Sequence, residues 1–129
     1  MAGSRVILLL AICFLAGCSG SLPRFTSGAS EEPLLLQGEA SYYDDEFAGR
    51  TTSNGEVYSP GGLTAAHRSL PFNTRLRVTN LENGLSVVVR VNDRGPWKAK
   101  RIIDLSREAA RRLKMIDAGT AQVRLEILP

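Results

Sequence analysis

The sequence predicts a small all-β domain, a barrel or a sandwich, that carries one short helix. Short runs with alternating or continuous β-branched residues follow one another from Gly38 onward, and turn residues separate them. One later segment alone has helical spacing. The chain has 129 residues, of which 43% are hydrophobic and 22% charged, which is typical of one globular domain.

Six runs are predicted as strands because they are rich in apolar or β-branched residues and are bounded by turn-forming residues. In chain order they are 39–43, 63–66, 75–79, 85–91, 102–104 and 122–128. The third and fourth runs form the clearest hairpin. Asn83 and Gly84 lie between them and tolerate the positive φ that a tight turn requires.

The helix is predicted over residues 106–114. Ser106 is a good N-cap, and Glu108 places a negative charge in the first turn. The apolar positions Ala109, Ala110 and Leu113 are spaced by three and four residues. One face of this helix can therefore cover the open end of a barrel.

The N-terminal segment is predicted to be a secretory signal peptide. Residues 6–16 form an apolar run after Arg5, shorter than the roughly 20 residues that a membrane-spanning helix needs. The sequence from Leu15 to Cys18, Leu-Ala-Gly-Cys, resembles a bacterial lipobox, which predicts that Cys18 is acylated and anchors the protein. The alternative is an ordinary signal end with a chance thiol. We expect a signal peptide over 1–17, a lipidated Cys and flexible tether over 18–37, and the domain over 38–129.

Charge and composition exclude several classes of function. Sixteen basic against thirteen acidic residues give a net charge of +3, too mild and too interspersed for a nucleic-acid surface. One His and two Cys do not make a zinc site of the Cys and His type. We therefore expect no metal, no cofactor and no nucleic acid, and chemistry that depends on carboxylates.

Polar side chains follow two apolar strands at the points where those strands end. His67 follows Thr64-Ala65-Ala66, and Asp93 precedes the turn Arg94-Gly95-Pro96. Glu56 lies in a loop that could reach the same rim. The three side chains are the candidate catalytic group.

Each of these residues also has a structural interpretation. Asp93 could cap the turn that follows it, and His67 could satisfy a structural hydrogen bond. Glu56 could be a solvated loop carboxylate. For Asp104, which precedes the predicted helix, a capping or bracing role is favoured over a catalytic one.

Five motifs in fixed order resemble the rare lipoprotein A (RlpA) family. They are Gly38-Glu39-Ala40-Ser41-Tyr42-Tyr43, Thr64-Ala65-Ala66-His67-Arg68-Ser69-Leu70-Pro71-Phe72, Val78-Thr79-Asn80-Leu81-Glu82-Asn83-Gly84, Val89-Arg90-Val91-Asn92-Asp93-Arg94-Gly95-Pro96 and Ile103-Asp104-Leu105-Ser106.

The resemblance implies a six-stranded double-psi β-barrel. It also implies a peptidoglycan lytic transglycosylase, which cleaves glycan strands between N-acetylmuramic acid and N-acetylglucosamine, leaves 1,6-anhydro ends and favours strands without stem peptides. The family's functional residues fall on Glu56, His67 and Asp93.

Lytic cleavage needs a proton donor for the glycosidic oxygen and a base for the muramyl 6-hydroxyl. We expect Asp93 to fill both roles in turn. A nearby Glu56 carboxylate would keep Asp93 protonated near neutral pH, and His67 would hold Asp93 or bind the sugar.

Aromatic and basic residues are expected to bind the glycan strand. Tyr42, Tyr43 and Trp97 offer flat faces for sugar rings, and Arg94 can attract an anionic polymer. Alternatively, Trp97 plugs the barrel end. The expected partners are peptidoglycan glycan strands and, through the lipid on Cys18, a membrane.

We expect a monomer in the cell envelope, anchored to the outer membrane and facing the periplasm. Two other functions stay open. One is a peptidoglycan-binding or expansin-like wall-loosening lipoprotein without turnover. The other is hydrolysis of a β-linked polysaccharide, which would leave reducing ends.

Overall fold

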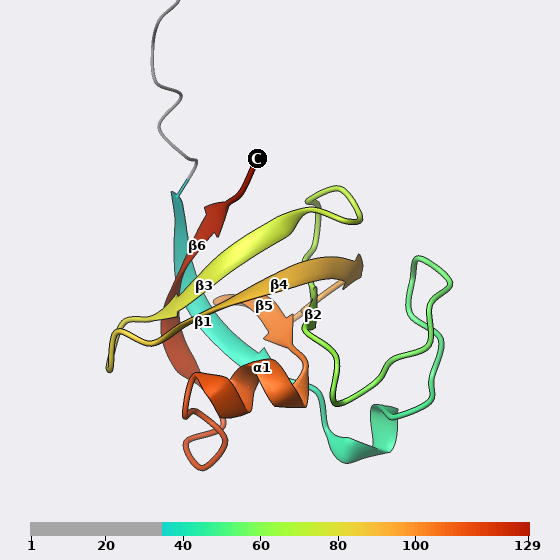
Figure 1. The fold of residues 1–129 in the computed structure, drawn as a ribbon, viewed down its shortest axis with the longest axis horizontal. Coiled ribbons are helices and arrows are strands. Elements are labelled where there is room, and N and C mark those ends of the chain that lie inside the picture. The colour runs from blue at the N-terminus through green and yellow to red at the C-terminus, as the bar shows by residue number, and fades with distance from the viewer. Residues whose placement is uncertain (1–34) are drawn as a thin grey trace, which may run out of the picture. The chain divides into compact units, whose positions relative to one another are not determined.

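The structure, a computed structural model, describes residues 35–129. Six strands and two short helices make up this part of the chain (Figure 1). They are β1 (Leu35–Tyr42), η1 (Asp45–Phe47), β2 (Thr64–Ala66), β3 (Arg75–Asn80), β4 (Ser86–Asp93), β5 (Arg101–Leu105), α1 (Arg107–Arg112) and β6 (Ala121–Ile127).

The strands close into a barrel in the order β1-β5-β2-β4-β3-β6. Two pairs are parallel, β1 with β5 and β2 with β4, and the other pairs are antiparallel. Each parallel pair joins strands that are not consecutive in the chain, so connections must cross over the barrel. The predicted six-stranded barrel with one α-helix is confirmed.

The β3–β4 hairpin forms as predicted because its side chains alternate between buried and exposed. Leu76 is paired with Val89 and Val78 with Val87, and all four are buried. Gly84 adopts a φ of 75° in the turn, a conformation that costs glycine little.

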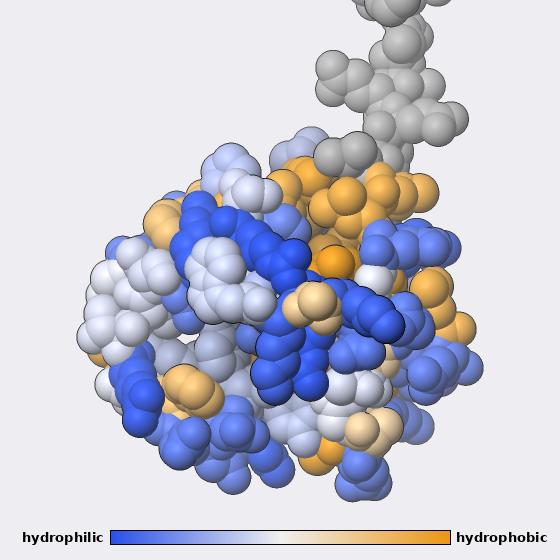
Figure 2. Space-filling model, turned by 180° about the vertical axis from the view of Figure 1, so that it is seen from behind, coloured by the Kyte–Doolittle hydropathy of each residue, from blue (hydrophilic) through white to orange (hydrophobic). Residues whose placement is uncertain are grey.

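Side chains fill the barrel interior. Fully buried leucine, isoleucine, valine and methionine residues come from four strands and from the segment around α1, so that no open channel is left for a substrate. Hydrophilic residues predominate on the face shown in Figure 2, and the hydrophobic ones gather mainly on one side of it. A binding site must therefore be built at the surface, from strand ends and loops.

The helix α1 covers one end of the barrel (Figure 1). Ser106 caps it, and its hydroxyl accepts a hydrogen bond from the Ala109 amide at 3.2 Å. Ala110 and Leu113 are completely buried, as the predicted apolar face requires. The helix ends at Arg112, two residues before the predicted end, because Lys114 adopts a left-handed φ of 53°.

The first strand begins earlier than the domain start expected at residue 38. Leu35 is already paired with Glu126 of β6, so residues 35–37 of the expected tether belong to the barrel. The predicted signal peptide and Cys18 lie outside the described residues. Within residues 35–129 no helix is long and apolar enough to span a bilayer.

Candidate active site

A surface cleft of about 670 Å³ lies at the C-terminal ends of β1 and β4. The segment between β1 and β2, which runs outside the barrel in Figure 1, forms one wall, and the loop after β4 forms another. Three groups of functional side chains line it. They are the carboxylates Asp44, Asp93 and Asp104, the cations Arg50, Arg94, Lys98 and Arg101, and the aromatic residues Tyr42, Tyr43, Phe47, Tyr58 and Trp97.

Two of these carboxylates come from strands on either side of β2. Ala66 of β2 is paired with Asp93 of β4 and also with Asp104 of β5. With a strand spacing of about 4.8 Å, the two aspartate Cα atoms are about 10 Å apart. Because both residues line the cleft, two carboxyl groups face the same space from strands on either side of β2.

Asp93 is held by four hydrogen-bond donors. Its Oδ2 accepts from the Tyr43 hydroxyl at 2.6 Å. Its Oδ1 accepts from the Ser53 amide at 2.9 Å, the Ser53 hydroxyl at 2.7 Å and the Arg94 amide at 2.9 Å. Burial by itself raises the pKa of Asp93, but the four donors together lower it below the ordinary value. Asp93 is therefore a carboxylate at neutral pH, contrary to the expectation that it is kept protonated.

Tyr43, the residue directly after β1, is the donor that reaches Asp93 Oδ2. Burial, followed by the hydrogen bond to Asp93 and its negative charge, raises the pKa of Tyr43 well above the ordinary value. The phenol thus keeps its proton and remains a donor. Its ring packs 4.6 Å from the Tyr58 ring and 5.7 Å from the Phe47 ring, between centroids.

Asp104 is the site residue for which sequence reasoning favoured a structural role. Its Oδ1 accepts a hydrogen bond from the Ser41 hydroxyl. Its Oδ2 makes no hydrogen bond to any residue in the described part of the chain. The sequence carried a signal for this, because Asp104 stands between the apolar residues Ile103 and Leu105 in a strand. These two side chains are buried in the core, so alternation turns Asp104 to the opposite face of β5.

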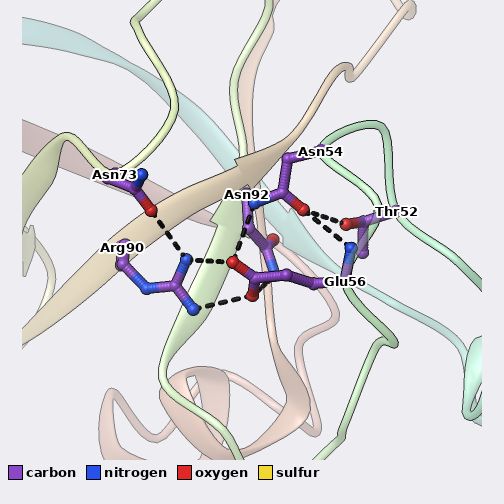
Figure 3. A network of polar contacts seen from close by, with 6 residues as sticks. All are labelled: Thr52, Asn54, Glu56, Asn73, Arg90 and Asn92. Carbon is purple, nitrogen blue, oxygen red and sulfur yellow. Dashed lines mark hydrogen bonds and ion pairs between the residues drawn. The ribbon is translucent and has the colours of Figure 1, made fainter.

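Glu56 does not line the cleft, and its partners are shown in Figure 3. Its two oxygens lie 2.6 and 2.7 Å from the guanidinium nitrogens of Arg90, and the Asn54 and Asn92 amides donate to it at 2.8 and 3.3 Å. These contacts, with Arg90 first, lower the pKa of Glu56 to about 2. The expected contact between the Glu56 and Asp93 carboxyl groups is absent among these interactions, since Arg90 binds both oxygens of Glu56, and Tyr43, Ser53 and Arg94 bind those of Asp93.

His67 is also outside the cleft lining. Its side chain is buried, and Nδ1 accepts hydrogen bonds from the amides of Ser69 and Leu70, both at 3.1 Å. Burial and the nearby Arg94 and Arg68 lower its pKa, so the ring is neutral with its proton on Nε2. The contact between His67 and Asp93 is a backbone one, from the His67 amide to the Asp93 carbonyl at 3.1 Å.

The four residues expected to bind substrate, Tyr42, Tyr43, Arg94 and Trp97, all line the cleft, but some of their side chains are already bound to other parts of the protein. The Trp97 side chain is free for contact because the residue is 76% exposed, so it does not plug the barrel end. The Tyr42 hydroxyl donates to the Ile116 carbonyl at 2.8 Å, which fixes its ring. Arg94 donates to the Leu70 carbonyl at 2.7 Å and lies 4.0 Å from the centroid of the Phe72 ring.

Arg68 is a residue that sequence reasoning passed over. Its guanidinium donates to the carbonyls of Pro96 and Lys98, both at 2.6 Å, and of Arg101 at 2.9 Å. These three bonds fix the loop that carries Trp97. Only the folded chain brings these carbonyls to Arg68, so no local pattern predicts the contact.

Three cations of the cleft, Arg50, Arg94 and Lys98, have no acidic partner among the described residues, and the Arg94 guanidinium is already bound to the His67 and Leu70 carbonyls. Arg50 lies 5.1 Å from the centroid of the Phe47 ring, and Lys98 lies on the opposite loop. Arg101, in contrast, pairs with Glu39 at 3.3 Å. Arg50 and Lys98 can therefore meet an anionic group of a ligand. Within residues 35–129 no cluster of three or more His, Cys, Asp or Glu side chains could hold a metal ion.

Comparisons with solved structures support the fold. The Streptomyces papain inhibitor has a TM-score of 0.60 at 21% identity, over 74% of this chain and 96% of the inhibitor. A mutant Clavibacter michiganensis expansin in complex with cellohexaose has a TM-score of 0.61 at 20% identity, over 74% of this chain and 51% of the expansin. Together with the closed barrel, these matches confirm the double-psi β-barrel that the resemblance implied.

Curated relatives are much more similar in sequence. An RlpA-type relative from Nostoc sp. is 60% identical over 102 residues, which are 78% of this chain and 28% of the relative. The endolytic peptidoglycan transglycosylase RlpA of Campylobacter jejuni is 48% identical over 120 residues, 88% of this chain and 44% of the relative. The chain thus spans less than half the length of these relatives. The family model described as lytic transglycolase matches residues 36–125, and the chain belongs to this family.

Proposed function

We propose that this domain is a peptidoglycan lytic transglycosylase. It cleaves glycan strands between N-acetylmuramic acid and N-acetylglucosamine and leaves 1,6-anhydromuramyl ends. The observation that carries the proposal is the pair of carboxylates, Asp93 and Asp104, that face one cleft in a chain of the lytic transglycolase family.

The reaction exchanges one glycosidic bond for an internal one. The bond from muramyl C1 to the bridging oxygen breaks, and that oxygen leaves as a hydroxyl after it receives a proton. The muramyl 6-hydroxyl attacks C1 and gives up its proton to a base. No water is consumed, and the positive charge that develops near C1 needs a nearby anion.

The two aspartates suit different parts of this reaction. Asp93 is fixed as an anion by four donors and can stabilise the positive charge near C1. Asp104 lines the cleft and has an oxygen without a partner among the described residues, so this oxygen is available to a bound substrate. In its acid form it protonates the bridging oxygen, and as a carboxylate it then takes the proton of the 6-hydroxyl. The proton transfer expected of Asp93 is thus assigned to Asp104, because a carboxylate with four donors is a poor acid.

The walls of the cleft suit a glycan strand without stem peptides. Trp97 offers an exposed ring for a sugar face. The stem peptide is attached through the lactyl carboxyl group of N-acetylmuramic acid, so this group is a free carboxylate only on peptide-free strands. Arg50 and Lys98 are available to bind that carboxylate. We therefore expect the cleft to bind peptide-free strands, which keep the negative lactyl carboxylate, in preference to strands that carry stem peptides.

The domain is further proposed to act as a monomer from a membrane anchor in the cell envelope. The apolar run 6–16 and the Leu-Ala-Gly-Cys sequence that ends at Cys18 support lipidation of this cysteine. Several acyl chains on one residue suffice for stable anchoring, here to the outer membrane on its periplasmic side. A Cys18→Ala protein should move to the soluble fraction, and continued sedimentation with membranes would contradict the anchor.

The activity is tested by incubating the purified protein with peptide-free glycan strands and analysing the products by mass spectrometry. Anhydromuramyl ends that disappear in Asp104→Asn are expected. Reducing ends would indicate hydrolysis instead. Strand binding without either product would indicate a wall-binding or wall-loosening role, which the structural likeness to an expansin makes the second candidate.

A further inference from the structure

Glu56 lies outside the cleft, yet its carboxylate accepts four side-chain hydrogen bonds, two from Arg90 and one each from Asn54 and Asn92. We infer that Glu56 is a positioning residue that holds Ser53 against Asp93 and has no contact of its own with the substrate. The inference rests on the proposed function and assigns the way in which this carboxylate serves the reaction.

Ser53 and Glu56 belong to the same closed loop. Thr51 and Val57 form a bridge that closes the loop, and the Thr52 amide donates to the Glu56 carbonyl at 2.7 Å. Gly55, with a φ of 89°, makes the tight turn between them, and its amide donates to the Thr52 carbonyl at 3.0 Å. Ser53 and Glu56 are therefore parts of one closed unit.

Glu56 attaches this loop to β4. Glu56 and Arg90 form a two-point ion pair at 2.6 and 2.7 Å, the strongest geometry for such a pair. Arg90 is itself held by the Asn73 side-chain oxygen at 3.0 Å, and the Asn92 amide adds a contact to Glu56 (Figure 3). The loop is thus anchored to the strand that carries Asp93.

The same loop contacts Asp93 through Ser53. Ser53 donates both its amide and its hydroxyl to Asp93 Oδ1, at 2.9 and 2.7 Å. These are two of the four donors that fix the carboxylate and lower its pKa. Without the Glu56 side chain, the contact of this loop with β4, apart from these Ser53 bonds, is reduced to the Asn54 amide, which donates to the Asn92 carbonyl at 3.4 Å. We therefore expect Ser53 to shift and its two hydrogen bonds to Asp93 to weaken, while the donors from Tyr43 and Arg94 stay in place.

A direct catalytic role for Glu56 does not fit the geometry. Both of its oxygens are occupied by Arg90, and it does not line the cleft. Its pKa of about 2 keeps it ionised at neutral pH, so it has no proton to give to a leaving group. The same ion pair makes it a weak base.

The test compares Glu56→Gln with Arg90→Gln. If the pair acts by positioning, each variant should lower turnover by about 100-fold, the effect of a displacement of about 1 Å at a reacting group. Each should also raise the pKa of the Asp93 carboxyl group, measured by NMR titration, and move the acid limb of the activity profile to higher pH. A catalytic Glu56 predicts that Arg90→Gln, which leaves the carboxylate in place, retains most of its activity.

The exposed pair Arg77–Glu126, at 2.9 Å on β3 and β6, supplies a matched control. Glu126→Gln should change neither activity nor the Asp93 titration. Ser53→Ala, which removes one of the two donors, should raise the Asp93 pKa by less than Glu56→Gln does. The inference is overturned if Asp93 titrates as in the wild type in folded Glu56→Gln protein. That titration needs no turnover, so it is independent of whether the wild type proves to be a lytic enzyme.

Discussion

At the scale of single residues, the cleft aspartates Asp93 and Asp104 differ in how they are held. Four donors fix Asp93 as an anion, whereas Asp104 has a single side-chain donor among the described residues, from Ser41. A residue that exchanges protons must be able to change its charge, and a residue that stabilises a cation must not. The difference in surroundings thus supports different chemical roles for the same side chain.

Asp104→Asn should reduce turnover of peptide-free strands by roughly 100-fold to 10,000-fold, the usual effect of losing an acid–base group. Asp93→Asn should likewise lose turnover, because a neutral amide cannot stabilise the positive charge that develops near C1. Affinity for the strand should change little in Asp104→Asn, as measured by co-sedimentation with insoluble peptidoglycan. Wild-type turnover in Asp104→Asn would remove this residue from the mechanism.

His67 should make the protein less stable in mild acid. Its pKa in the folded state is lowered by burial and by Arg94 and Arg68, so protonation favours the unfolded chain. The contribution of neutral His67 is complete above the ordinary pKa of about 6.5 and is lost as the pH falls from there toward the lowered value. His67→Asn, whose side-chain oxygen can replace Nδ1 as acceptor, should unfold in urea with a weaker dependence on pH between 7.5 and 5. An identical pH dependence in both proteins would contradict this.

At the scale of elements, short segments are held by side chains that bond to the backbone of distant loops. Arg68 binds three carbonyls of the loop that carries Trp97. Ser106 joins the start of α1 to the loop before β2, since its hydroxyl also donates to the Gly62 carbonyl at 2.6 Å. A six-residue helix is too short to be stable alone, so such contacts decide whether it forms.

Ser106→Ala should lower the free energy of unfolding by about 1–2 kcal/mol. The substitution removes the cap on the Ala109 amide and leaves the Gly62 carbonyl without this donor. Urea unfolding followed by circular dichroism measures the loss. Arg111→Ala, which breaks only an exposed ion pair with Glu108, should cost less than about 1 kcal/mol. An equal loss in both variants would contradict a specific role for the cap.

At the scale of the whole molecule, barrel closure brings together strand ends that are far apart in sequence. Ser41 of β1 meets Asp104 of β5, and Tyr43, directly after β1, meets Asp93 of β4, because β5 lies between β1 and β2. In the resulting cleft, the carboxylates Asp93 and Asp104 lie on strands, and the cations Arg50 and Lys98 lie on the surrounding loops. This distribution of charge can distinguish ligands by the presence of a negative group.

Arg50→Gln and Lys98→Gln should each reduce the preference for peptide-free over peptide-bearing strands. A charged hydrogen bond to the lactyl carboxylate is worth about tenfold in rate, and a strand whose lactyl group is an amide does not make it. The ratio of initial rates on the two substrates measures the effect. Arg75→Gln, on β3 and outside the cleft lining, is the control and should leave the ratio unchanged. A ratio that stays constant in both cleft variants would refute recognition of the carboxylate.

The sequence by itself determined the elements whose signals are local. The alternation in β3 and β4, the Asn83-Gly84 turn and the Ser106 cap lie within a few residues of the structures they specify, and the structure confirms them. The five motifs likewise pointed to the family, which the comparison with the family model confirms.

Only the tertiary structure decided which carboxylates share a site. Glu56 and Arg90 are 34 residues apart, and Asp104 and Ser41 are 63 apart, so their contacts depend on strand order and register. A residue's charge and neighbours in sequence say nothing about which cation or donor will face it after the barrel closes. For this reason Glu56 was expected beside Asp93 but pairs with Arg90, and Asp104, expected to brace the barrel, bonds to Ser41 of β1 and also lines the cleft.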